Sequence, residues 1–196
     1  MIAGNSKGRT IDVAIVADVA RLLASHADAE ADVAPANAEA VRVIRPRSKL
    51  VLATTAAQTV QRASNKIAFD VAAGATVRFY AKSGSNNFED AVLIEDISPI
   101  DDGGALQDFA LANVERNTVA PRDYDSVFPA RLPERDFWFW QCAVATDGDQ
   151  HCSVLLAAFD RDEQGRPRLA GHYRWALQLT VTLTSPSSPT HQGETS

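Results

Sequence analysis

Residues 137–175 read FWFWQCAVATDGDQHCSVLLAAFDRDEQGRPRLAGHYRW, and this stretch decides the fold class. Its apolar runs are interrupted by two turn sequences, DG at 147–148 and DEQG at 162–165. Asp-Gly between apolar runs is the strongest short-range indication of a β-hairpin. The stretch therefore predicts strands joined by two hairpin turns, at 137–145, 152–159 and 168–175.

Alternation of apolar and polar residues with a period of two continues the β pattern outside this stretch. It is clearest at 177–184, where apolar residues alternate with Gln and Thr, and it recurs at 67–71 and 77–82. Branched apolar residues predict a first strand over 11–17, and another is expected at 91–94. Residues 41–52 suit a sheet-edge segment or a turn around a proline.

Few residues indicate helix. Asp18 directly follows the first predicted strand and is a suitable N-cap for a short helix over 19–24. Four prolines and a Gly-Gly pair interrupt residues 98–136, which predicts a long irregular excursion with a short helical piece near 106–114. A parallel α/β fold needs a helical crossover between strands, and only one predicted helix follows a strand.

About eight strands, little helix and closely spaced turns predict an all-β protein. We expect an antiparallel β-sandwich, of jelly-roll or immunoglobulin-like type, with one short helix after the first strand. Residues 1–184 are expected to form this single domain, because 196 residues suit one domain. Residues 185–196 are rich in Ser, Thr and Pro and are expected to be a disordered polar tail.

Composition argues against several classes of partner. The net charge is −6 at pH 7, whereas proteins with general affinity for nucleic acid normally carry a basic face. The first apolar run, 11–17, contains Asp12 and is too short to cross a membrane. The first ten residues lack the apolar core of a signal peptide, and two cysteines make no secreted disulfide framework. We therefore expect a cytoplasmic protein that binds neither nucleic acid nor membrane.

Three segments resemble the AidA/PixA family, the bacterial inclusion body protein family. They are 10–18 (TIDVAIVAD), 77–88 (VRFYAKSGSNNF) and 159–175, which begins FDRD and ends GHYRW. In order, they are similar to the family's opening strand, to its strand that leads into an S-x-N-F loop, and to its ending. The resemblance implies a β-sandwich, self-association, and expression tied to cell density, as in quorum sensing, or to stationary phase. It supplies no catalytic residue.

Two features depart from that family. Its final Trp is usually followed by Asp-Pro, whereas Trp175 is followed by Ala176 and Leu177. One branch is rich in methionine and accumulates as intracellular inclusions, whereas this chain has a single methionine, Met1. A role in amino-acid storage is therefore not expected here.

The aromatic run 137–140 is the strongest candidate site. On a strand, its two Phe face opposite to Trp138 and Trp140, so either both faces are buried or one aromatic pair is exposed. An exposed pair would serve a protein interface or a sugar-binding surface. We therefore name Trp138 and Trp140, with Asn86 and Asn87 of the loop at 83–88, as candidate ligand-binding residues.

Neither a metal site nor a catalytic site is predicted. Residues 160–165 resemble the start of a calcium loop, but the twelfth position is Gly171 rather than Glu, so a hairpin turn is the better interpretation. Cys142, Cys152 and His151 lack a fourth zinc ligand, and free thiols are expected. No catalytic or nucleotide-binding motif occurs, so we expect neither enzymatic activity nor a cofactor.

The leading hypothesis is a non-enzymatic, self-associating protein of the inclusion body type that is at least a dimer. A single sandwich buries only one face of each sheet, so aromatics on the other face need a cover. That cover is either a second copy or the excursion at 98–136. The alternative hypothesis is a β-sandwich module that binds carbohydrate or another small ligand.

Overall fold

The computed structural model describes residues 10–27, 41–44, 50–55, 65–102, 104–118 and 133–184. Ten strands and one helix, α1 (Val19–Ala27), lie in these ranges. The strands are β1 (Thr10–Ala17), β2 (Val41–Ile44), β3 (Val51–Thr55), β4 (Lys66–Val71), β5 (Thr76–Ser83), β6 (Ala91–Pro99), β7 (Leu106–Asn117), β8 (Glu134–Val144), β9 (Gly148–Arg161) and β10 (Pro167–Leu183).

The strands form two five-stranded sheets. One has the order β3-β1-β5-β8-β7, and the other has the order β2-β10-β9-β6, with β4 pairing with the second half of β10. Both sheets are mixed, because β1 runs parallel to β5 and β10 runs parallel to β2 and β4. A mostly β fold with one short helix is thus confirmed, whereas a wholly antiparallel arrangement is wrong. The jelly-roll or immunoglobulin type stays a prediction.

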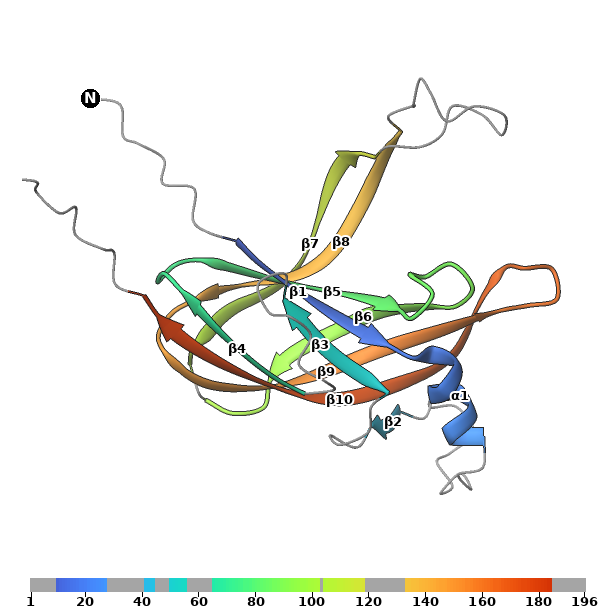
Figure 1. The fold of residues 1–196 in the computed structure, drawn as a ribbon, viewed down its shortest axis with the longest axis horizontal. Coiled ribbons are helices and arrows are strands. Elements are labelled where there is room, and N and C mark those ends of the chain that lie inside the picture. Colours follow the sequence, from blue (N-terminus) through green and yellow to red (C-terminus); the bar gives the residue numbers. More distant parts are fainter. Residues whose placement is uncertain are drawn as a thin grey trace, which may run out of the picture.

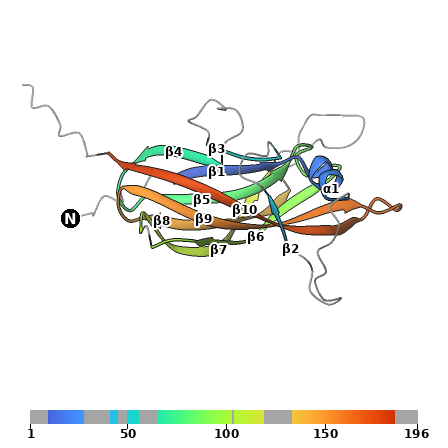
Figure 2. The same ribbon diagram turned by 90° about the horizontal axis from the view of Figure 1, so that it is seen from below.

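The hydrophobic core lies between the two sheets. One cluster of buried side chains includes Ile15 and Phe79 from the first sheet and Leu156, Trp175 and Leu179 from the second, so the sheets pack against each other as two layers. Along β10 the period-two pattern places alternate residues in this core. The hairpin that joins β9 to β10 projects at one end of the molecule (Figure 1, Figure 2).

The helix forms where the sequence predicts it. Asp18 caps α1 because its Oδ1 accepts the backbone N–H of Arg21 at 3.1 Å. Val19 and Leu22 of α1 are fully buried against the core. In the described ranges, no helix is long and apolar enough to cross a membrane.

The turn at 147–148 does not form the predicted hairpin. β8 pairs with β5 and β7, whereas β9 pairs with β10 and β6, so this turn carries the chain from one sheet to the other. Asp-Gly identifies a tight turn, here with Gly148 at φ 136°, but it does not select pairing partners. The second turn is a hairpin as predicted, and the Asp162 N–H donates to the Arg166 carbonyl at 2.9 Å.

Residues 98–118 are more regular than predicted. The helical piece near 106–114 is wrong, because these residues form most of β7, hydrogen-bonded along β8. The Leu- and Ala-containing sequence suits a helix locally, and pairing with β8 overrides that preference. The two predicted strands at 168–175 and 177–184 form one strand, β10, with an irregularity between Leu169 and Gly171.

Some expectations lie outside the described residues. They include the proposed tail at 185–196, the first nine residues and Pro46. The domain boundaries at 184 and 185 therefore stay a prediction. Within the described part, residues 41–44 form β2, a strand at the edge of the second sheet, as expected for an edge segment.

We predict that Trp175→Ala lowers the free energy of unfolding by roughly 3–5 kcal/mol, as large-to-small core changes do. Trp175 is fully buried between Ile44 and Val154 on the neighbouring strands, so its removal leaves a cavity. Denaturant titration measures the change. The matched control is Trp138→Ala, because Trp138 is 60% exposed and its loss should cost less than about 0.5 kcal/mol. Equal losses for the two variants would contradict the prediction.

Candidate functional site

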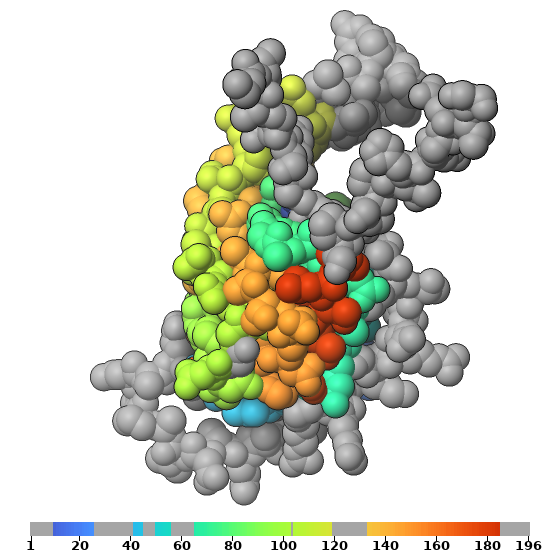
Figure 3. All heavy atoms as spheres, turned by 90° about the vertical axis from the view of Figure 1, so that its left-hand side faces the viewer, coloured from blue at the N-terminus to red at the C-terminus, as the bar shows by residue number. Residues whose placement is uncertain are grey.

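Strands β7 and β8 continue together beyond the rest of their sheet. β5 pairs with β8 only from Thr76↔Ala143 to Phe79↔Trp140, whereas β7 and β8 stay paired out to Asn117↔Glu134. Residues 112–117 and 134–139 therefore form a two-stranded projection, the β7–β8 ribbon, which points away from the body in Figure 1. In Figure 3 the yellow-green atoms of β7 line one border of the molecule out to this projecting end.

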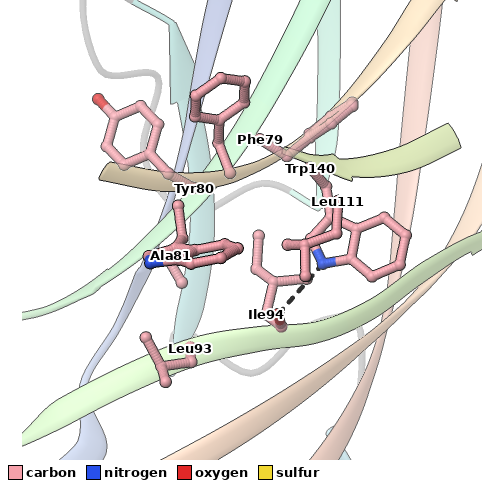
Figure 4. Close-up of a pocket in the computed structure, with 9 residues that line it drawn as sticks. Phe79, Tyr80, Ala81, Leu93, Ile94, Leu111 and Trp140 are labelled. Carbon is pink, nitrogen blue, oxygen red and sulfur yellow. Dashed lines mark hydrogen bonds between the residues drawn. The ribbon is translucent and has the colours of Figure 1, made fainter. Parts of the chain in front are cut away.

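A groove of about 350 Å³ opens where β8 parts from β5. β5 and β8 form its two walls, Leu111 of β7 lies beside β8, and β6 of the opposite sheet closes it below. The lining residues, most of them labelled in Figure 4, are Phe79, Tyr80, Ala81, Leu93, Ile94, Leu111, Trp138, Phe139 and Trp140. The groove is thus a consequence of the fork between two strands.

Trp140 ties the two sheets together at this fork. Its indole Nε1 donates a hydrogen bond to the Ile94 carbonyl of β6 at 3.2 Å, drawn as the dashed line in Figure 4. A partly buried indole N–H needs an acceptor, and the irregular pairing of β6 between Ile94 and Asp96 lies beside the carbonyl that supplies it. The bond holds the ring of Trp140 in a defined orientation.

Large apolar side chains form an exposed rim around the groove. Trp138 is 60% exposed, and Leu111 and Leu93 are each 53% exposed. Tyr80 is 39% exposed and adds its ring from the β5 wall. A contiguous apolar patch of this kind typically marks a contact site for a protein or a ligand.

Exposure of the aromatic run changes along the strand rather than between its faces. Phe139 and Trp140, near the body, are half-buried, whereas Phe137 and Trp138, on the ribbon, are 45% and 60% exposed. The guanidinium of Arg78 lies 4.8 Å from the centre of the Phe139 ring. Neither expected pattern, two buried faces or one exposed pair, describes this arrangement, because β8 leaves the sheet midway along the run.

Asn86 and Asn87 lie in the loop between β5 and β6, and neither lines the groove. The Asn87 Oδ1 accepts the backbone N–H groups of Ser83 at 2.7 Å and Val92 at 3.2 Å. Both asparagines have positive φ, 56° and 61°, a conformation that Asn tolerates better than most residues. Asn87 therefore holds the loop. The structure brings Trp138 and Trp140 together and leaves the asparagines outside, so their part in ligand binding stays a prediction.

Sequence reasoning named only the two tryptophans of the groove, and the lining residues that it missed include the exposed Tyr80, Leu93 and Leu111. Each lies on a different strand, and the alternation in β5 assigns Tyr80 to the face of the sheet that points away from the core. The register of the strands brings them together, and no local pattern in the sequence reports that register.

The described histidines pair with carboxylates away from the groove. The Nδ1 of His151 hydrogen-bonds to Asp101, and the Nδ1 of His172 lies 2.7 Å from the Glu95 Oε2. His191 lies outside the described residues, and the side chain of His26 is not described. In the ranges that the structure covers, no three His, Cys, Asp or Glu side chains are grouped to hold a metal ion.

The calcium-like sequence at 160–165 is a hairpin turn closed by ion pairs. Arg168 binds Asp160 at 2.6 Å, and its hydrogen bond lowers the pKa of that carboxyl. The backbone N–H of Arg166 lowers the pKa of Asp162, and its side chain adds an ion pair at 2.9 Å. Asp160 and Asp162 of this turn are therefore occupied by arginines.

Comparison with known proteins identifies the family. The family model of PixA, the inclusion body proteins, matches residues 9–181. The chain belongs to this family. The resemblance of its three segments is thus confirmed.

The crystal structure of a PixA inclusion body protein from Burkholderia cenocepacia is similar to this chain. The TM-score is 0.69 at 16% identity, covering 92% of this chain and 100% of that chain, which shows a shared fold. A cysteine protease inhibitor from Entamoeba histolytica matches with a TM-score of 0.23, 13% identity, and coverage of 60% of this chain and 84% of that chain. The solution structure of amebosin matches with a TM-score of 0.21 and 10% identity, covering 60% of this chain and 88% of that chain. No curated protein matches the chain.

The two cysteines of this PixA-family chain are buried in opposite sheets, as free thiols. Burial raises the pKa of Cys142 to about 12, and the neighbouring Cys152 contributes. Burial also raises the pKa of Cys152 to about 12, with a smaller contribution from Asp101. The thiolate is the reactive form, so both groups are protected from chemistry near neutral pH.

We predict that Ellman's reagent modifies neither thiol of the folded protein at pH 8, because this pH is far below the pKa of about 12 to which burial raises both thiols. Unfolding in guanidinium chloride should release two reactive thiols per chain. Because the pKa of both thiols is higher in the folded than in the unfolded state, their contribution to stability should fall as the pH rises from about 9 toward 12. Rapid modification of the native protein would contradict the assignment.

Proposed function

We propose that this protein self-associates through the β7–β8 ribbon, as a non-enzymatic cytoplasmic member of the PixA inclusion body family that is at least a dimer. One observation carries the proposal: the ribbon and its base expose Phe137, Trp138 and Leu111 by about half or more. Monomeric proteins rarely leave large apolar side chains grouped in this way, and burying them against a second copy is favourable.

The competing cover, the excursion at 98–136, does not shield these side chains within its described part. Residues 106–117 form β7, which pairs with β8 edge to edge and so extends the sheet sideways. The described residues of the excursion therefore cover neither face of the ribbon. Residues 119–132 lie outside the described part of the chain. A partner is the favoured cover for the aromatic side chains.

Membership of the family supports the biological part of the proposal. We propose expression that rises with cell density, under quorum sensing, or in stationary phase. Two free, buried thiols support a reducing compartment, the cytoplasm. Neither nucleic acid nor a membrane is proposed as a partner, because the net charge of −6 is unfavourable for both.

We predict that the average mass in sedimentation equilibrium rises above the 21.1 kDa of one chain as the protein concentration is raised from the micromolar toward the millimolar range. The double variant F137S/W138S should shift the mass toward 21.1 kDa, because it removes apolar surface that association buries. Its melting temperature should stay within a few degrees of the wild type, since both side chains are exposed.

Phe88→Ser is the matched control, because Phe88 is 73% exposed and lies outside the groove and the ribbon. This variant should associate like the wild type. A wild-type mass that stays at 21.1 kDa up to high concentration would contradict the proposed self-association.

A second candidate function is the binding of a carbohydrate or small flat ligand in the groove. Its volume of about 350 Å³ falls within the range of ligand pockets, and Trp138 offers an exposed ring for stacking. Few polar side-chain groups line the groove, and one of them, the indole N–H of Trp140, already donates to the Ile94 carbonyl. We propose that such a ligand presents a flat, weakly polar face to Trp138.

We predict that chito- or cello-oligosaccharides added at millimolar concentration change the tryptophan fluorescence of the protein. The exposed Trp138 should respond, whereas the fully buried Trp175 should not. The change should disappear in Trp138→Ala and persist in Phe88→Ser. An unchanged spectrum, or the same response in Trp138→Ala, would remove these sugars as ligands.

A further inference from the structure

The two faces of the β7–β8 ribbon carry opposite charges. Cross-strand pairs of an antiparallel ribbon share one face, and successive pairs alternate between the faces. Glu115 is paired with Asp136 on the face that carries Trp138, the groove face. The next pair is Arg116 with Arg135, and it lies on the face that carries Phe137, the outer face.

Each face thus sets two like charges side by side. Glu134 continues the acidic row on the groove face, opposite Asn117. Like charges directly opposite each other destabilise a strand pair. Among the described residues, neither Arg116 nor Arg135 forms an ion pair, and Asp136 has a 3.5 Å contact from the Asn113 side-chain amide. The ribbon cannot neutralise itself, because the opposite charges point away from each other.

Both faces also carry apolar side chains next to the charges. The groove face presents Trp138 beyond Leu111, and the outer face presents Phe137 beside Val114. Each face therefore combines an aromatic ring with one sign of charge. The two surfaces are complementary to each other and neither is complementary to itself.

We propose that the groove face of one copy's ribbon packs on the outer face of the ribbon of a second copy. Glu115 and Asp136 then meet the partner's Arg116 and Arg135, and Trp138 is covered. This inference rests on the proposed self-association and specifies its geometry. A symmetric dimer through either face would place carboxylates on carboxylates or arginines on arginines.

Contact between two different surfaces leaves one free surface of each kind on every pair. Such a heterologous contact extends into an open chain, or closes into a ring, instead of stopping at a dimer. The ribbon measures about 20 Å by about 10 Å from strand geometry, well below the roughly 800 Å² per partner of a stable interface. Association through it is therefore weak, concentration-dependent and reduced by salt.

Two charge-reversal variants test the pairing. R116E/R135E makes both faces acidic, and E115K/D136K makes both faces net basic, with Glu134 as the remaining acid on the groove face. Each variant alone should sediment at 21.1 kDa at concentrations where the wild type associates. An equimolar mixture should associate again, because every contact between unlike variants restores opposite charges. The controls R174E and E163K change exposed charges outside the ribbon and should associate like the wild type.

The outcomes separate this inference from the proposal beneath it. A wild type that stays monomeric at every concentration defeats self-association and this geometry together. If the wild type associates, three results would each contradict the face-to-face geometry alone. They are a charge-reversal variant that associates as well as the wild type, a mixture of the two variants that stays monomeric, and a control variant that also loses association. The single variant R135E guards against misfolding: it places unlike charges opposite each other in the ribbon, which should preserve or raise the melting temperature while weakening association.

Discussion

The pairing of β10 is the constraint on which the rest of the structure depends. This strand runs antiparallel to β9 along nearly its whole length, and its other edge accepts β2 and then β4 as parallel partners. Its inward side chains, among them Tyr173, Trp175 and Leu179, are fully buried and face the opposite sheet. One strand therefore supplies both the backbone ladder of a sheet and the centre of the core.

The opposite sheet is held less completely, and the candidate site arises there. β8 pairs with β5 only over residues 140–143, and the indole of Trp140 bonds to Ile94 across the layers. Residues 134–139 of β8 pair with β7 alone, and an isolated two-stranded ribbon is marginally stable in water. The exposed aromatics and like-charge pairs of the ribbon are also unfavourable, and the proposed contact with a second copy would relieve them.

The groove and the ribbon faces are two uses of the same aromatic residues. Trp138 lines the groove and also lies on the acidic face of the ribbon, so a ligand in the groove and a packed second copy would compete for its ring. Phe137 lies on the opposite face of the ribbon, so in the proposed geometry it would contribute to association and not to ligand binding. The variants that remove one ring or reverse one row of charges therefore distinguish the two functions.

The sequence by itself determined the class of the fold and the family. Alternation marked the buried residues of β4, β5 and β10, and Asp18 marked the start of α1, because these are local properties of the chain. It also identified Trp138 and Trp140 as candidates. Only the tertiary structure decided that β8 and β9 lie in different sheets, that β7 is a strand, and that Tyr80, Leu93 and Leu111 meet the tryptophans. These depend on register between distant strands, where backbone pairing outweighs local preference.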